Sequence, residues 1–198
     1  MKLIKFFVAN LFFALSLLLI YILHVNFFKI NVVFYSSILD GLLAALLTLT
    51  FVSLVSWLDV YSNFEKFQLM LSWLLLGYAF AISVPTVIDR SLSFYTLEKL
   101  QQRGGGIKLS AFEGVYAKEY MAEHRLVDVR LTEQEQSGTI LIQNDCVKLT
   151  AWGDTLATAS RYFRNHFLPK QRLLMGKYSS DLTDPFKNST MQVDYSCR

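Results

Sequence analysis

Charged side chains are scarce in the first half of this 198-residue chain. Aspartate, glutamate, lysine and arginine make up 18% of the whole sequence, against about 25% in an average soluble domain. Residues 1–88 contain seven of them, whereas the remaining 110 residues contain 15 basic and 13 acidic side chains. We therefore expect a lipid-embedded first half, followed by a region long enough for one small water-soluble domain.

Cysteine and histidine are also rare, and no catalytic set is recognisable. Neither Cys146 and Cys197 nor the three histidines have the spacing of a metal site. Two cysteines permit one disulfide, which their spacing does not establish. The sequence has no Walker motif, dinucleotide-binding fingerprint or nucleophile elbow. We expect no cofactor, no metal and a non-catalytic protein; a small membrane enzyme acting on a phosphate-bearing lipid stays as an alternative.

Long apolar runs dominate the first 90 residues, which form the predicted transmembrane domain (1–90). They predict three membrane-spanning helices, each near the ~20 residues that a bilayer needs. The first follows Lys2 and Lys5 but exceeds the ~7–15-residue core of a signal peptide, so we expect it to be retained. The predicted spans are about 6–28, 40–58 and 69–88.

The edges of these spans carry the polar features of the first half. Residues 31–40 suit an interfacial connector, which would leave Asp40 at a helix end within reach of water. Pro85 is expected to kink or end the third helix near Ser83, because proline lacks an N–H.

An acid and a base stand together where the third span ends, at Asp89 and Arg90. The guanidinium fork matches phosphate oxygens, so we predict a headgroup or partner contact here, shared with Ser91. Residues 91–107 are expected to form an amphipathic linker that ends in three glycines. Its bases Lys99 and Arg103 are assigned to the same contact.

The predicted soluble domain (108–168) opens with two capping-box patterns. Ser110-x-x-Glu113 predicts a helix from Ala111 to about His124, and Thr132-x-x-Glu135 predicts a second, short helix. Between them, residues 125–130 alternate as in a short strand or an extended link.

A hairpin is the clearest local signal in the chain. Strands at 139–143 and 146–150 flank Asn144-Asp145, two residue types that tolerate a tight turn. Thr150 is then expected to cap a helix from Ala151 to about Phe167. Residues 169–198 are predicted to be a polar tail, in which residues 172–175 continue a helix briefly.

The end of this hairpin resembles the wing of MarR- and PadR-like winged-helix domains. Val147-Lys148-Leu149-Thr150-Ala151-Trp152-Gly153-Asp154-Thr155-Leu156-Ala157 looks like their "RLT-x-x-G-x-x-L" stretch, and Ser137-Gly138-Thr139-Ile140 is similar to the turn before the wing. The resemblance covers roughly residues 108–168. It implies a winged-helix fold and, taken alone, DNA binding.

The charges oppose DNA binding. Residues 104–170 hold eight bases and eight acids, and Glu133 and Glu135 occupy the position of the recognition helix. DNA affinity rests largely on neutralising phosphates, so nucleic acid is not expected as a partner. We assign Glu133, Glu135, Arg161 and Arg164 to protein contact instead.

The fold expected from these patterns is a mainly α membrane protein with a small α+β winged-helix-like domain. The expected function is a non-catalytic accessory or adaptor subunit of an integral membrane complex, in envelope glycan or lipid assembly; a membrane-tethered DNA-binding regulator is a second alternative. Expected partners are membrane lipids and another protein or further copies of the chain. Five bases near the membrane on one side against three on the other favour a bacterial inner-membrane protein with a cytoplasmic carboxyl-terminal domain.

Overall fold

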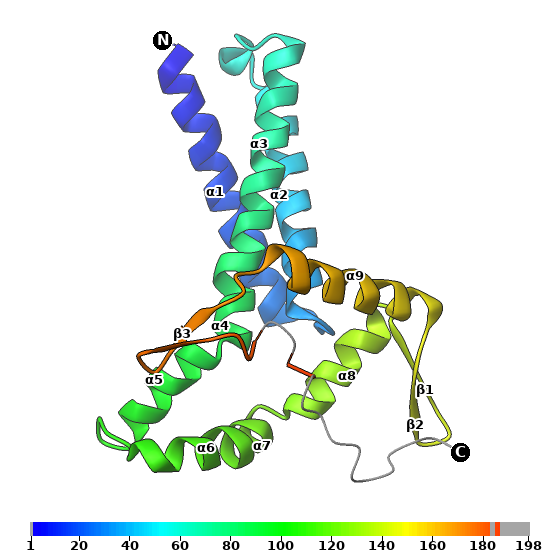
Figure 1. Ribbon diagram of the computed structural model, residues 1–198. Helices are drawn as coiled ribbons and strands as arrows, with labels where there is room; N and C mark the ends of the chain where they lie inside the picture. Colours follow the sequence, from blue (N-terminus) through cyan, green and yellow to red (C-terminus); the bar gives the residue numbers. More distant parts are fainter. Residues whose placement is uncertain (1, 183–184, 187–198) are drawn as a thin grey trace. The chain divides into compact units, whose positions relative to one another are not determined.

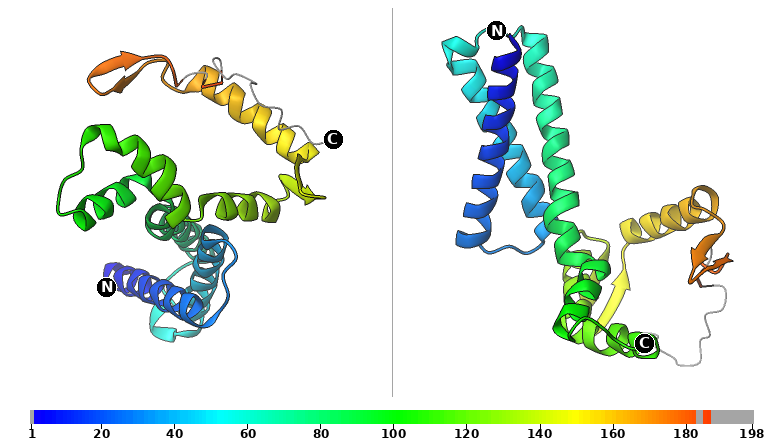
Figure 2. Two further views of the ribbon diagram at one scale, coloured as in Figure 1. Left: turned by 90° about the horizontal axis from the view of Figure 1, so that it is seen from below. Right: turned by 90° about the vertical axis from the view of Figure 1, so that its left-hand side faces the viewer.

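The computed structural model describes residues 2–182, 185 and 186, and it is mostly helical (73%). The chain divides into two compact units, Met1–Tyr120 and Met121–Arg198. Figures 1 and 2 show the helices and strands of both.

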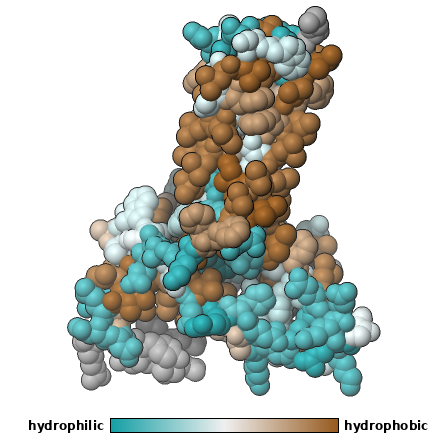
Figure 3. All heavy atoms as spheres, turned by 180° about the vertical axis from the view of Figure 1, so that it is seen from behind, coloured by the Kyte–Doolittle hydropathy of each residue, from teal (hydrophilic) through white to brown (hydrophobic). Residues whose placement is uncertain are grey.

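Three long helices form the greater part of the first unit. All three are long and apolar enough to cross a membrane, which confirms the expectation of a membrane protein. Apolar side chains cover most of the face of these helices that Figure 3 shows. They are α1 (Lys2–Phe27), α2 (Val33–Leu54) and α3 (Asn63–Ala81), the last continued by a π-helix (Ile82–Thr86) and by α4 (Val87–Arg90).

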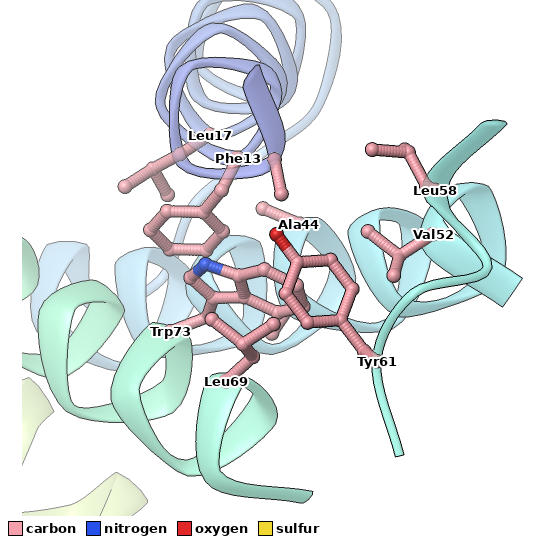
Figure 4. Close-up of a cluster of buried hydrophobic side chains, with 10 residues drawn as sticks. Phe13, Leu17, Ala44, Val52, Leu58, Tyr61, Leu69 and Trp73 are labelled. Atoms are coloured by element: carbon pink, nitrogen blue, oxygen red, sulfur yellow. The ribbon is translucent and has the colours of Figure 1, made fainter. Parts of the chain in front are cut away.

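The core of this bundle is built around Trp73 of α3, which is fully buried. Its ring stacks against Phe13 of α1 at a centroid distance of 6.1 Å, and Leu69 and Tyr61 lie beside it (Figure 4). The indole N–H donates a hydrogen bond to Asn10 Oδ1 at 3.2 Å. This side-chain bond adds a specific link between α1 and α3 to their packing.

Two boundaries of the spans differ from the sequence prediction. Helix α2 begins at Val33, so the expected connector is mostly helical and Asp40 lies inside the helix, buried. The prediction that Asp40 reaches water at a helix end is wrong. Near Ser83, where Pro85 was expected to kink or end the third helix, α3 ends at Ala81 and passes into a π-helix that contains Pro85, and helical structure then continues to Arg90.

A short helical region completes the first unit. Helix α5 (Leu92–Gln102) confirms the predicted helix of the linker; Ser91 caps it, accepting from Phe94 N–H at 3.3 Å. The predicted single helix after Ala111 is divided, and Ser110 does not cap it, because a 3₁₀ turn places Ala111 at the helix start. The pieces are a 3₁₀ turn (Leu109–Ala111), α6 (Phe112–Gly114), a π-helix (Val115–Tyr120) and, in the second unit, α7 (Met121–Glu123).

Helix α8 (Leu126–Gln136) replaces two predicted elements of the second unit. The expected strand at 125–130 is wrong, and so is a helix start at Thr132. Ion pairs one helical turn apart, Arg125–Asp128 at 2.7 Å and Arg130–Glu133 at 2.9 Å, support the helix over this stretch.

The hairpin and the helix after it are confirmed. Strands β1 (Ile140–Gln143) and β2 (Cys146–Leu149) pair antiparallel across Asn144 and Asp145, both at positive φ, and α9 spans Ala151–Phe167. Cys146 forms a disulfide; Cys197 lies outside the described residues.

Thr150 fastens α9 to the end of the hairpin. Its hydroxyl donates to the Gly138 carbonyl at 2.8 Å and accepts from the Gly153 N–H at 3.0 Å. Gly153 packs so closely that an added Cβ would overlap the carbonyl oxygen of Thr139. The threonine and glycine of the wing-like motif therefore have a structural reason for their spacing.

A second, smaller hairpin follows α9. Strands β3 (Arg172–Leu174) and β4 (Lys177–Ser179) pair across Met175 and Gly176. The brief helix predicted at 172–175 is wrong, because both turn residues take the positive φ of a tight hairpin.

Candidate functional site

A histidine and an aspartate meet inside the three-helix bundle. His24 lies in the last turn of α1 and Asp40 in the second turn of α2. His24 Nδ1 and Asp40 Oδ1 are 2.6 Å apart. The Asp40 side chain is 1% exposed and that of His24 is 19% exposed. Ionisable groups within a membrane span are costly, so a pair kept there is a candidate functional site.

The pair leaves two polar atoms without partners. Oδ2 of Asp40 is buried and has no hydrogen-bond partner among the residues that the structure describes. Nε2 of His24 likewise has no hydrogen bond to any described residue. A buried carboxylate oxygen is normally satisfied, so this one calls for an explanation.

A pocket of about 330 Å³ adjoins the pair. Apart from His24 and Asp40, its wall consists of apolar side chains contributed by α1, α2 and the loop between them. The ring of Phe28 packs edge-on against His24 at a centroid distance of 5.5 Å. The apolar lining residues are Ile20, Leu23, Phe28, Leu39 and Leu43.

The opposite end of the bundle has a second pocket, of about 540 Å³, beside Lys2 and Glu65. Here the charged groups satisfy each other, because Lys2 Nζ lies 2.6 Å from Glu65 Oε1. Glu65 Oε2 also accepts from the N–H of Ser62, at 2.8 Å, in the capping box that starts α3. Both carboxylate oxygens of Glu65 therefore have partners, whereas Asp40 has one oxygen without a described partner.

Two of the three residues predicted to form a headgroup contact at the end of the third span lie close together. Asp89 Oδ2 and Arg90 Nε are 3.8 Å apart, a long ion pair. Ser91 caps α5 with its hydroxyl. Lipid or partner contact by these three residues stays a prediction.

Lys99 and Arg103 of the linker converge on one acid, Glu119. Lys99 Nζ lies 2.7 Å and Arg103 Nη2 3.0 Å from Glu119 Oε2. The hydrogen bond from Lys99, followed by that from Arg103, lowers the pKa of Glu119 below its ordinary value. Lys99 is 4% exposed and packs by Tyr95, whose ring contacts that of Tyr120 at 4.7 Å. The cluster thus holds α5 against the π-helix at Val115–Tyr120.

The predicted protein-contact residues of the second unit lie on two helices. On α8, Glu133 pairs with Arg130 and Glu135 is exposed. On α9, Arg161 is exposed and Arg164 is half-buried. No described contact brings the four together.

Helix α9 exposes apolar side chains along one side. Positions 152, 156, 163 and 167 fall within about 60° of one another around a helix axis, at ~100° per residue. We call these four side chains the α9 face. They are 41–65% exposed: Trp152, Leu156, Phe163 and Phe167.

Within residues 2–182, 185 and 186, no group of three His, Cys, Asp or Glu side chains is placed to hold a metal ion. Comparison of the chain with protein-family models, with curated proteins and with solved structures found no match.

The His24–Asp40 pair is the site that sequence reasoning missed. A signal for it existed: residues 32–39 are themselves largely apolar, which continues the second run upstream and encloses Asp40. The aromatic residues at 34 and 35 instead suggested a headgroup belt.

Proposed function

We propose that the chain is a non-catalytic accessory or adaptor subunit of an integral membrane complex. In this proposal the three long helices anchor the protein in the bilayer, and residues 108–168 act as a winged-helix-like module that contacts a protein partner. Envelope glycan or lipid assembly is the proposed setting.

The α9 face carries the proposal. Four large apolar side chains on one stripe of a 17-residue helix are exposed, and contiguous exposed apolar surface is typical of interaction sites. Asp154 and Arg161 lie on the other side of the helix, at about 150–170° from the centre of the stripe. The α9 face suits an apolar groove or helix of a partner, because its side chains recur at i, i+4 spacing, as in helices that bind in grooves.

Helix α8 supports protein contact over DNA binding. It holds three acids, Asp128, Glu133 and Glu135, against the single base Arg130. A helix with this charge would be repelled by phosphates. The order helix, hairpin, helix supports the resemblance to a winged helix.

We further propose that this is a bacterial inner-membrane protein with the carboxyl-terminal domain in the cytoplasm. The bases near the membrane support this side by five to three: Lys29, Arg90, Lys99, Arg103 and Lys108 against Lys2, Lys5 and Lys66. The disulfide at Cys146 argues against a cytoplasmic domain, because disulfides persist in oxidising compartments.

Copurification tests the adaptor function. The tagged chain would be extracted in mild detergent beside a face variant, Leu156→Ser with Phe163→Ser, and a control variant, Asp154→Ser with Arg161→Ser, on the other side of α9. We expect a stoichiometric partner with the wild type and the control but not with the face variant. A homogeneous homomer, or equal recovery of the partner with the face variant, would refute the proposal.

A further inference from the structure

We propose that the pocket beside His24 and Asp40 binds the ammonium group of a lipid, with an acyl chain against the apolar wall. The site lies in the first unit and does not depend on the proposed adaptor function.

The buried carboxylate of Asp40 is the reason to expect a ligand in this pocket. An ionised carboxyl group has about four acceptor positions, and described residues fill one of them, through His24. A buried charge with incomplete hydrogen bonding is costly. A cationic hydrogen-bond donor delivered to this pocket would supply the missing hydrogen bond and offset the cost of burying the carboxylate.

The two open atoms indicate a hydrogen-bond donor. When His24 is neutral and its Nδ1–H donates to Asp40 Oδ1, the other ring nitrogen, Nε2, is an acceptor. Asp40 Oδ2 is an acceptor as well, so in this tautomer both atoms call for N–H or O–H groups. A primary ammonium has three such donors and a positive charge. A phosphate has neither, and Asp40 would repel it.

The wall of the pocket indicates an amphiphile instead of a small water-soluble amine. Leu23, Leu39 and Leu43 line it and are each about half exposed on the outer side of the bundle, where lipid chains lie. Asp40 stands seven residues into α2, about 10 Å along the helix axis at ~1.5 Å per residue. That is near one end of the span, within reach of a lipid whose headgroup lies at the interface.

Native mass spectrometry of the detergent-purified full chain tests the site. The probes are phosphatidylethanolamine, phosphatidylcholine and phosphatidylglycerol with identical acyl chains. Phosphatidylcholine has the same charge distribution but no N–H donor. We expect phosphatidylethanolamine to bind about tenfold more tightly than either, which corresponds to ~1.4 kcal/mol. Equal binding of the ethanolamine and choline lipids, or preference for the glycerol lipid, would overturn the proposal.

Two variants locate the binding. Asp40→Asn keeps the shape of the side chain and removes its charge, and Leu43→Trp fills the pocket while keeping the pair. Both are expected to abolish the preference for phosphatidylethanolamine. Asp59→Asn, an exposed loop acid, and Leu42→Trp, outside the pocket wall, are the matched controls and should keep it. If Asp40→Asn does not fold, Leu43→Trp decides: a preserved preference in that variant refutes the site.

A single-chain probe separates the sources of the ammonium group. Decylammonium has the headgroup chemistry and an apolar chain but no phosphate. Binding of both decylammonium and phosphatidylethanolamine supports the lipid assignment. Binding of decylammonium alone would overturn it in favour of a free alkylamine.

Discussion

Gly41 of α2 and Gly77 of α3 touch backbone to backbone where the two helices cross. A Cβ added to Gly77 would lie 2.9 Å from the Gly41 Cα, and one added to Gly41 would lie 3.0 Å from the Gly77 Cα. Small residues at such crossings let membrane helices approach closely enough for dispersion contacts, which must supply the attraction that water does not.

Gly77→Ala should therefore destabilise the bundle. The added methyl group has only backbone to displace, and overpacking of this kind costs about 1–3 kcal/mol. Gly114→Ala is the control, since a Cβ there meets nothing within 4 Å. Unfolding in detergent, followed by the intrinsic fluorescence of the three tryptophans, which include the buried Trp73, measures the difference. Equal stability of the two variants would show that α2 and α3 are not held at this distance.

Gly153→Ala should loosen the second unit at the junction of β2 and α9. A methyl group there would overlap the Thr139 carbonyl oxygen and crowd Leu149 Cδ1, so α9 must shift off the hairpin. We expect faster hydrogen exchange of β1 and β2 in the variant, measured by mass spectrometry on the full chain. Gly106→Ala, at an open position in the other unit, should exchange as the wild type does. Unchanged protection in Gly153→Ala would contradict the described packing.

The cluster around Glu119 predicts an acid sensitivity of the first unit. Because the folded pKa of Glu119 is below its ordinary value of 4.5, its ionised form stabilises the fold fully at pH values above 4.5. That contribution is lost as the pH falls through the lowered folded pKa. Lys99→Met should raise the pKa of Glu119 and move the loss of Tyr95–Tyr120 packing to higher pH.

Carbon-13 NMR of the labelled glutamate carboxyl groups measures this pKa directly. Lys118→Met is the matched control, because Lys118 is exposed and is not among the groups that shift Glu119. A Glu119 pKa that is the same in Lys99→Met as in the wild type would rule out the buried ion pair.

Thiol labelling determines the side of the membrane on which the second unit lies. Neither cysteine is in the three spans, so a membrane-impermeant maleimide reports on this unit alone. Because Cys146 forms a disulfide, intact and permeabilised cells are labelled with and without a membrane-impermeant reductant. The proposed cytoplasmic side predicts labelling only after permeabilisation. Labelling of intact cells after reduction would reverse the topology and exclude a DNA-binding role.

Periodicity and turn chemistry predicted the elements that depend on local sequence. The three spans, α5, the β1–β2 hairpin and α9 each have a strong local signal, such as Asn144-Asp145 or Thr150. The first part of α8 was missed because a short alternating stretch also fits an extended strand, and the ion pair Arg130–Glu133 that supports the helix is seen only once the backbone is helical.

The site was less predictable because it depends on contacts between helices. His24 and Asp40 are 16 residues apart and meet only when α1 and α2 pack antiparallel. The same holds for Lys99 and Glu119, which form an ion pair across a turn. Sequence reasoning treated Lys99 as a surface base, since a lysine gives no local sign of burial.

The π-helix at Ile82–Thr86 sets the direction in which the first unit continues beyond the bundle. A π-turn holds one more residue than an α-turn, and one residue corresponds to about 100° of rotation around a helix axis. Removing a single residue from this turn would keep the apolar contacts of α3, which precedes it. It would rotate Asp89, Arg90 and the start of α5 about the helix axis. The extra residue of this π-turn thus sets the rotation, about the helix axis, of the helices that follow the membrane anchor.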